Sequence, residues 1–123
     1  MCIQKIFKDR CRNEDGDRMP LFMVKKEYFD LYKLGKKDVE LRDVKPQWKN
    51  SKVGDIAIIQ SGRKNMLRKG ITKIHRGSLA RIFKEIDYKR IFPEALTMFR
   101  AVHSTIELYP KAKEFMAFEL EDV

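Results

Sequence analysis

Several residue types and patterns are scarce in this 123-residue chain, and their scarcity excludes whole classes of protein. The two cysteines, Cys2 and Cys11, both lie near the N-terminus, so they cannot cross-link the rest of the chain. Reduced thiols of a cytoplasmic protein are the expectation. The longest aliphatic run, Ile56–Ile59, is far shorter than the roughly 20 apolar residues of a membrane-spanning helix. Because the N-terminus also lacks the apolar stretch of a secretory signal, we expect a cytoplasmic protein with no membrane partner.

Motifs for metals and cofactors are missing as well. His75 and His103 fall on different predicted elements, and neither has a cysteine at metal-ligand spacing, so we expect no metal site. The glycines, such as Gly54 and Gly62, are isolated turn residues rather than parts of a phosphate-binding loop. We therefore expect no cofactor.

Acidic residues are absent from one long internal segment. Between Asp55 and Glu85 the chain has eight Lys and Arg residues and no acid, whereas the remainder has 19 basic and 18 acidic residues. Nearly all of the net charge of +9 belongs to this basic segment. Such a concentration of charge attracts polyanions, most often nucleic acid, although a solvated hairpin that only aids solubility is the alternative. The candidate nucleic-acid contacts are Arg63, Lys64, Arg68, Lys69, Lys73 and Arg76.

Composition divides the chain into two parts. Residues 1–18 have mixed charge and few large apolar groups, so we interpret them as an N-terminal arm in which Ile3, Ile6 and Phe7 could form a short helix. The chain is 43% hydrophobic, enough for one core, and we place a single domain over residues 19–123.

Apolar periodicity predicts an α+β fold for this domain. We expect strands over 21–24, 39–44, 56–60, 66–75 and 115–120. We expect a first helix of about ten residues that carries Tyr28 to Leu34 and stops at Gly35, and further helices over 79–86 and 93–108. The last helix is assigned from Pro93 at its first position and from an apolar side formed by Ala95, Met98, Phe99, Val102, Ile106 and Tyr109. Short strands without regular strand–helix alternation favour a small, mostly antiparallel sheet or barrel with about three helices packed on it.

The junction between the first predicted helix and the following strand, residues 35–42, carries three charged side chains. Glu40 and Arg42 share one face of the strand, and Lys37 can fold over from the turn to meet the Glu40 carboxylate. A lysine, a glutamate and an arginine that converge at a cleft could bind a phosphate or a base edge, or form a proton-transfer pair. A surface ion-pair network of little energetic value is the alternative.

The spacing Gly-x-Lys-x-x-Glu-x-Arg at residues 35–42, followed by a Gly54-Asp55 turn into an apolar strand, resembles the ASCH domain family of PUA-like proteins. The likeness covers residues 21–120 and extends to the segments around Phe92 and Tyr109. It implies a small mixed, mostly antiparallel β-barrel with about three flanking helices and a cleft, generally proposed to bind RNA.

Together, the charge and the resemblance predict a basic RNA-binding domain in which the cleft, through Lys37 and Arg42, acts beside the basic segment. Trp48 is a candidate for stacking on an unpaired base, with a plug at the end of the barrel as an equal alternative.

A branch of the family resembles an acetylcytidine amidohydrolase with a catalytic lysine, a threonine three residues later and a glutamate just before the long helix. The resemblance makes Lys37, Glu40 and Glu94 the catalytic candidates, although Glu40 replaces the threonine and a carboxylate there would raise the pKa of Lys37. Hydrolysis of RNA or of a modified nucleoside is therefore the alternative function, and an adaptor for an acidic protein partner is a third. The sequence leaves the oligomeric state open.

Overall fold

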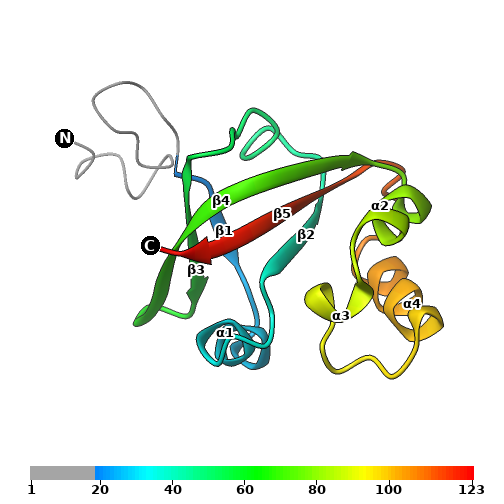
Figure 1. Ribbon diagram of the computed structural model, residues 1–123, viewed down its shortest axis with the longest axis horizontal. Helices are drawn as coiled ribbons and strands as arrows, with labels where there is room; N and C mark the ends of the chain where they lie inside the picture. Colours follow the sequence, from blue (N-terminus) through cyan, green and yellow to red (C-terminus); the bar gives the residue numbers. More distant parts are fainter. Residues whose placement is uncertain (1–18) are drawn as a thin grey trace.

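The computed structural model describes residues 19–123, which form a curled sheet with helices against it (Figure 1). The strands are β1 (Leu21–Met23), β2 (Val39–Asp43), β3 (Ile56–Ser61), β4 (Asn65–Gly77) and β5 (Phe115–Asp122). Their order is β1-β3-β4-β5-β2, with β1 parallel to β3 and every other neighbouring pair antiparallel. Because β1 and β2 are the two edges of this sheet, it forms a half-barrel rather than a closed barrel.

The predicted α+β class is confirmed, with one more helix than expected. The helices are α1 (Lys26–Lys33), α2 (Leu79–Glu85), α3 (Tyr88–Ile91) and α4 (Met98–Leu108). Helix α3 was not predicted because four residues are too few to show helical periodicity. No helix within residues 19–123 is long and apolar enough to cross a bilayer. The predicted arm over residues 1–18, with Cys2 and Cys11, lies outside the described residues.

The prediction for the last helix is wrong in both its start and its buried side. Thr97 caps α4, its side chain accepting a hydrogen bond from the backbone N–H of Arg100 at 3.2 Å. Pro93 therefore lies in a turn that precedes the helix. The buried residues are Ala101 and Thr105, whereas Phe99 is 75% exposed. Small side chains let α4 approach the domain closely, and the Thr105 hydroxyl is satisfied by the carbonyl of residue 101 at 2.9 Å.

Two hydrophobic clusters lie on the two faces of the sheet. The first joins α1 to one face and is centred on Phe22, Trp48 and Phe118. The second lies between the other face and helices α2, α3 and α4, and includes Val39 and Phe115. The predicted alternation along β2 is confirmed, because Val39 faces the second cluster while the next residue turns its carboxylate to the opposite face. This alternation directs Glu40 and Arg42 away from the layer formed by α2, α3 and α4.

Truncating a phenylalanine to alanine should cost more stability in the core than on the exposed side of α4. Phe118 is fully buried, so Phe118→Ala should lower the free energy of unfolding by about 3–5 kcal/mol. Phe99→Ala, at a position first expected in the core, should change it by no more than about 0.5 kcal/mol in dilute protein. Urea denaturation of both variants checks the pair, and similar losses would contradict the observed orientation of α4.

Candidate functional site

A pocket of about 220 Å³ opens between the two edge strands of the sheet, next to α1 and the end of α4. Its walls combine charged groups with aromatic and aliphatic ones: Met23, Val24, Lys25, Tyr28, Lys37, Glu40, Leu41, Arg42, Ile91, Phe92, Leu108 and Tyr109. Three predicted site residues, Lys37, Glu40 and Arg42, thus line one concavity. Pockets that bind small organic groups have this composition, a mostly apolar wall with a few convergent polar groups.

Arg42 connects the two edges of the sheet. Its Nε donates to Glu40 Oε2 at 2.6 Å, and its Nη2 donates to the carbonyl oxygen of Met23 in β1 at 2.5 Å. The guanidinium carbon lies 5.4 Å from the ring centroids of both Phe22 and Trp48. Its Nη1 makes no hydrogen bond within residues 19–123, so this nitrogen can donate to a ligand in the pocket.

Glu40 is buried and has both carboxylate oxygens engaged. Its Oε1 accepts a hydrogen bond from the Tyr32 hydroxyl at 2.5 Å, while Oε2 accepts from Arg42. Burial raises the pKa of Tyr32, and the adjacent Glu40 charge raises it further, so the tyrosine remains the donor. A carboxylate with both oxygens occupied is better suited to positioning Arg42 than to accepting a proton from a substrate.

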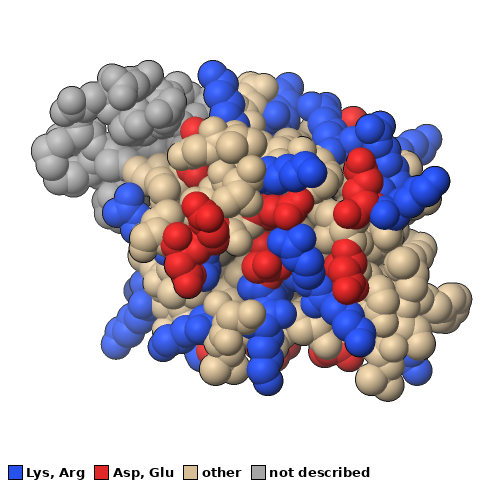
Figure 2. Space-filling model, in the orientation of Figure 1, with Lys and Arg blue, Asp and Glu red and all other residues tan. Residues whose placement is uncertain are grey.

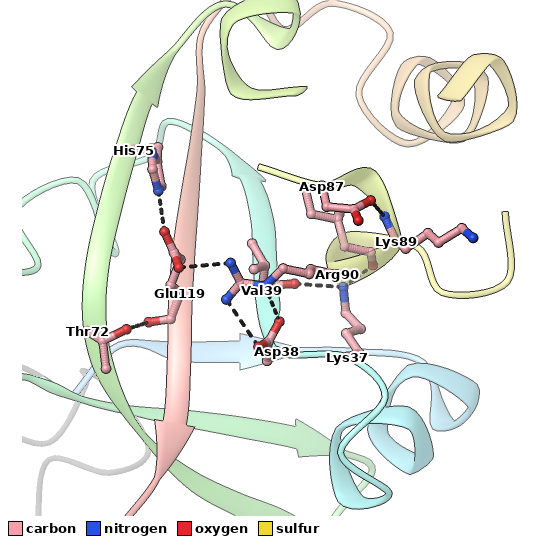
Figure 3. Close-up of polar contacts among 10 residues, drawn as sticks. Lys37, Asp38, Val39, Thr72, His75, Asp87, Lys89, Arg90 and Glu119 are labelled. Carbon is pink, nitrogen blue, oxygen red and sulfur yellow. Dashed lines mark hydrogen bonds and ion pairs between the residues drawn. The ribbon is translucent and has the colours of Figure 1, made fainter. Parts of the chain in front are cut away.

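The predicted contact between Lys37 and the Glu40 carboxylate is absent from the ion pairs among residues 19–123. The Lys37 ammonium instead donates to the backbone carbonyls of Val39, at 2.8 Å, and Ile91. Figure 3 shows the side chain reaching from the turn after α1 towards the carbonyl of Val39. The rings of Tyr28, Tyr32 and Phe92 surround the ammonium at 5.2–5.7 Å from their centroids. The chain reverses at the turn after α1, and this reversal places the Lys37 amine beside these two carbonyls. The spacing of residues in the sequence did not predict this contact.

Burial reverses the pKa shift expected for Lys37. The loss of solvation lowers its pKa from 10.5 to about 8, against the opposing effect of the negative charges of Glu40 and Glu94. Two N–H groups of the Lys37 amine donate to carbonyl oxygens. The third position on the nitrogen carries a proton when the amine is charged and a lone pair when the amine is neutral. Lys37 can therefore act either as a donor or as a base near neutral pH.

Glu94 lies at the rim rather than in a helical first turn. It is exposed, and its Oε2 accepts a hydrogen bond from the hydroxyl of Tyr28, which lines the pocket, at 2.9 Å. Since α4 begins only at Met98, Glu94 lies outside the helix that was predicted to start at Pro93. Its place beside Tyr28 depends on the turn at Pro93.

An ion-pair network holds the carbonyl ligands of Lys37 in place (Figure 3). Arg90 of α3 pairs with both oxygens of Asp38 at 2.9 and 3.1 Å, and its Nη1 donates to Glu119 of β5 at 3.0 Å. Glu119 also contacts the buried ring of His75 at 2.5 Å. Burial alone would raise the pKa of Glu119, but the hydrogen bonds from His75 and Arg90 lower it. Because Asp38 and Arg90 flank Lys37 and Ile91 in the chain, the network connects α3 to the start of β2.

The basic segment is partly neutralised by acids from β5 and the turn before it. Lys69 pairs with Asp122 at 2.5 Å, and Arg76 pairs with Glu114 at 2.9 Å. The charge count along the sequence did not include these acidic partners, because they lie outside the basic segment. The antiparallel pairing of β4 with β5 brings them next to the lysine and the arginine. Figure 2 accordingly shows acidic side chains between the lysines and arginines. Four of the six predicted contacts have no acidic partner within residues 19–123: Arg63, Lys64, Arg68 and Lys73.

The tip of the β3–β4 hairpin extends past the end of β1 that lines the pocket. Met23 of β1, which lines the pocket, is paired with Gln60, and Ser61 is paired with Asn65 across the turn. Arg63 and Lys64 occupy that turn, so the register places two unpaired cations beyond the pocket-lining end of β1.

Trp48 is a core residue, not an exposed stacking platform. It is only 7% exposed, its ring lies 5.3 Å from that of Phe22, and its Nε1 donates to the carbonyl oxygen of Asp43 at 2.8 Å. Its burial in the first hydrophobic cluster favours the alternative, a packing role. The aromatic residues that do line the pocket are Tyr28, Phe92 and Tyr109.

Solved structures share this architecture. The hypothetical protein PH0355 matches with a TM-score of 0.72 and 24% identity, covering 84% of this chain and 97% of its own. Protein PF0455 from Pyrococcus furiosus matches with a TM-score of 0.62 and 19% identity, covering 82% and 94%. The ASCH protein of Zymomonas mobilis matches with a TM-score of 0.61 and 18% identity, covering 83% of this chain and 66% of its own. No family model matches the sequence, and no curated protein does.

These likenesses show the fold, a curled α+β half-barrel that this chain shares with the three solved structures. One of the three is an ASCH protein, so the ASCH-type fold predicted from the signature at residues 35–42 is confirmed.

The environment of Lys37 predicts an unusual titration. In NMR spectra of the side-chain amine, its midpoint should lie at about 8 rather than at 10.5. Because the Glu40 charge raises the Lys37 pKa, Glu40→Gln should move the midpoint further down. A midpoint near 10.5, or an upward shift in the variant, would contradict the described burial and charge arrangement.

Proposed function

We propose that the protein binds RNA and receives an unpaired base in the pocket. The observation that carries this proposal is the pocket lining, in which Arg42 and Lys37 supply hydrogen-bond donors among aromatic rings. Nucleobases combine a stacking surface with polar edges, and proteins recognise them in unpaired RNA by stacking and by hydrogen bonds to those edges. Tyr28 and Tyr109 offer ring surface, and Arg42 Nη1 is free to meet an oxygen or nitrogen acceptor.

The phosphates of the same strand would contact the hairpin tip. Arg63 and Lys64 are exposed, have no acidic partner within residues 19–123, and follow the strand that pairs with the pocket wall. Arg68 and Lys73 continue the positive charge along β4. The proposal thus narrows the six predicted cations to these four, and it does not use Lys69, Arg76 or Trp48.

A salt titration tests this arrangement. Binding of a single-stranded RNA should weaken steeply with salt, by about 0.7 logarithmic units of affinity per phosphate contact for each tenfold increase in salt. The double variant Arg63→Gln/Lys64→Gln should therefore reduce this slope by roughly 1.4. Lys84→Gln/Lys89→Gln, which removes two exposed charges from α2 and α3, is the matched control and should change the slope little. No binding at low salt, or equal effects of the two doubles, would refute the proposal.

The lowered Lys37 pKa favours a second candidate, hydrolysis of an acylated nucleoside in the same pocket. Neutral Lys37 would accept a proton from water as the water oxygen attacks the acyl carbonyl carbon. The amine would then return that proton to the leaving nitrogen as the C–N bond breaks, giving a carboxylic acid and the free nucleoside. Both Glu40 oxygens are engaged, so Glu40 would position the site and Lys37 would move the proton.

Turnover of acetylcytidine decides this second candidate. The rate should rise with pH and level off above about 8, since only the neutral amine is a base. Lys37→Met keeps an unbranched side chain as far as the Cε position but removes the amine, so it should abolish turnover. Lys36→Met, at the exposed neighbouring position, should not. Turnover that survives Lys37→Met, or no turnover in the wild type, excludes Lys37 catalysis of this reaction.

A further inference from the structure

Helix α4 and the loop before it leave large apolar side chains in solvent. Leu96, Phe99 and Ile106 are 87%, 75% and 53% exposed, and Val102 is half-buried between the last two. Residues at spacings of three, four and seven lie on one side of a helix, so Phe99, Val102 and Ile106 form a stripe along α4. Leu96 lies in the loop just before the N-cap of this helix. We name these four residues the α4 stripe. Figure 2 shows a largely uncharged region at the right, where Figure 1 places α4.

Charged residues border the α4 stripe in a self-complementary order. Arg100 directly follows Phe99, and Glu107 directly follows Ile106. His103 lies midway between these two charges, stacked on Phe99 at 6.4 Å between ring centroids and paired with Glu107 at 2.7 Å. If a second, identical helix is laid antiparallel to this one with the two His103 residues facing each other, the apolar residues of one helix meet apolar residues of the other. Arg100 of each helix then lies opposite a negative charge.

We propose that the α4 stripe pairs with the same stripe of a second copy, with the two α4 helices antiparallel about a twofold axis near His103. This isologous contact sets Phe99 against Ile106 of the partner subunit, and Arg100 opposite Glu107 of the partner subunit. The partner is argued from this match of charge and order, which a second copy of the chain satisfies without any other molecule. Removal of exposed apolar surface from water is the driving force.

The size of the stripe sets the expected strength of the dimer. At about 200 Å² for a large apolar side chain, the exposed parts of Leu96, Phe99 and Ile106 amount to roughly 400 Å². That is about half of what each partner of a standard interface buries, and the exposed rim of Arg100, His103 and Glu107 adds to it. We therefore expect a weak dimer, with a dissociation constant on the order of micromolar. Leu108, which lines the pocket, lies on the opposite side of α4, so the dimer leaves the pocket open.

Sedimentation equilibrium of the full chain tests the contact. The wild type should be dimeric at high concentration and monomeric at low concentration. Phe99→Ser should weaken the dimer at least tenfold, while Lys64→Glu, on the exposed hairpin tip, should not. A wild type that stays monomeric at every concentration overturns the proposal. The stripe would then be covered by something other than a second copy, such as residues 1–18 or RNA. A dimer that Phe99→Ser leaves intact overturns it as well.

Charge reversal tests the antiparallel arrangement specifically. Arg100→Glu alone and Glu107→Arg alone should each weaken self-association, because each sets like charges opposite one another. An equimolar mixture of these two single variants should form a heterodimer of wild-type strength, since every pair is then complementary. The double variant should also recover self-association. Failure of the mixture to associate while the wild type does would overturn the antiparallel contact. RNA binding at the pocket is measured separately and does not depend on this outcome.

Discussion

The hydrogen-bonded pair of Glu40 and Arg42 is the interaction on which the site depends. The half-barrel has two open edges, β1 and β2, and the Arg42 guanidinium joins them by donating to the carbonyl of Met23. Glu40 fixes the guanidinium from one side, and Tyr32 of α1 fixes Glu40 from the other. A buried charge is stable only when its hydrogen bonds are satisfied, and removing one partner leaves the other uncompensated. The position of α1 against the edge strands, and hence the pocket between them, follows from this pair.

Lys37 shows how the same frame creates a reactive group. The short turn after α1 directs the amine inward, where two backbone carbonyls take the place of water as hydrogen-bond acceptors. Three aromatic rings around the amine keep other water molecules away. Carbonyl dipoles compensate burial only in part, which is why the pKa falls despite two nearby carboxylates. The pairing of Arg90 with Asp38 joins the two segments that carry these carbonyls, and Glu119 binds the same guanidinium. The pocket therefore joins a fixed cation, Arg42, to a cation that titrates near neutral pH, Lys37.

Local patterns predicted the fold class, the strands and the convergence of Lys37, Glu40 and Arg42, because alternation on β2 and the helix end near Gly35 are encoded by neighbouring residues. Long-range features were not predictable from the same signals. The acids that pair with Lys69 and Arg76 lie beyond 30 residues along the chain and meet them only through strand pairing. The amphipathic pattern of α4 predicted that its large apolar side chains are buried. In the structure the helix buries the side that carries the small residues Ala101 and Thr105, which allow close packing. Tyr28 carried no signal beyond helical spacing, which does not distinguish a core from a pocket wall.

An NMR titration of the protein with single-stranded RNA tests the central claim most directly, namely that the pocket between β1 and β2 is the binding site. The account predicts that the largest shifts of backbone amides occur around Met23–Lys25, Arg42 and Tyr109, with the hairpin tip at Arg63 and Lys64 shifting beside them. It also predicts that the Lys37 amine signal changes in the same titration. Saturable RNA binding that leaves these pocket signals unchanged and shifts another surface would contradict the account.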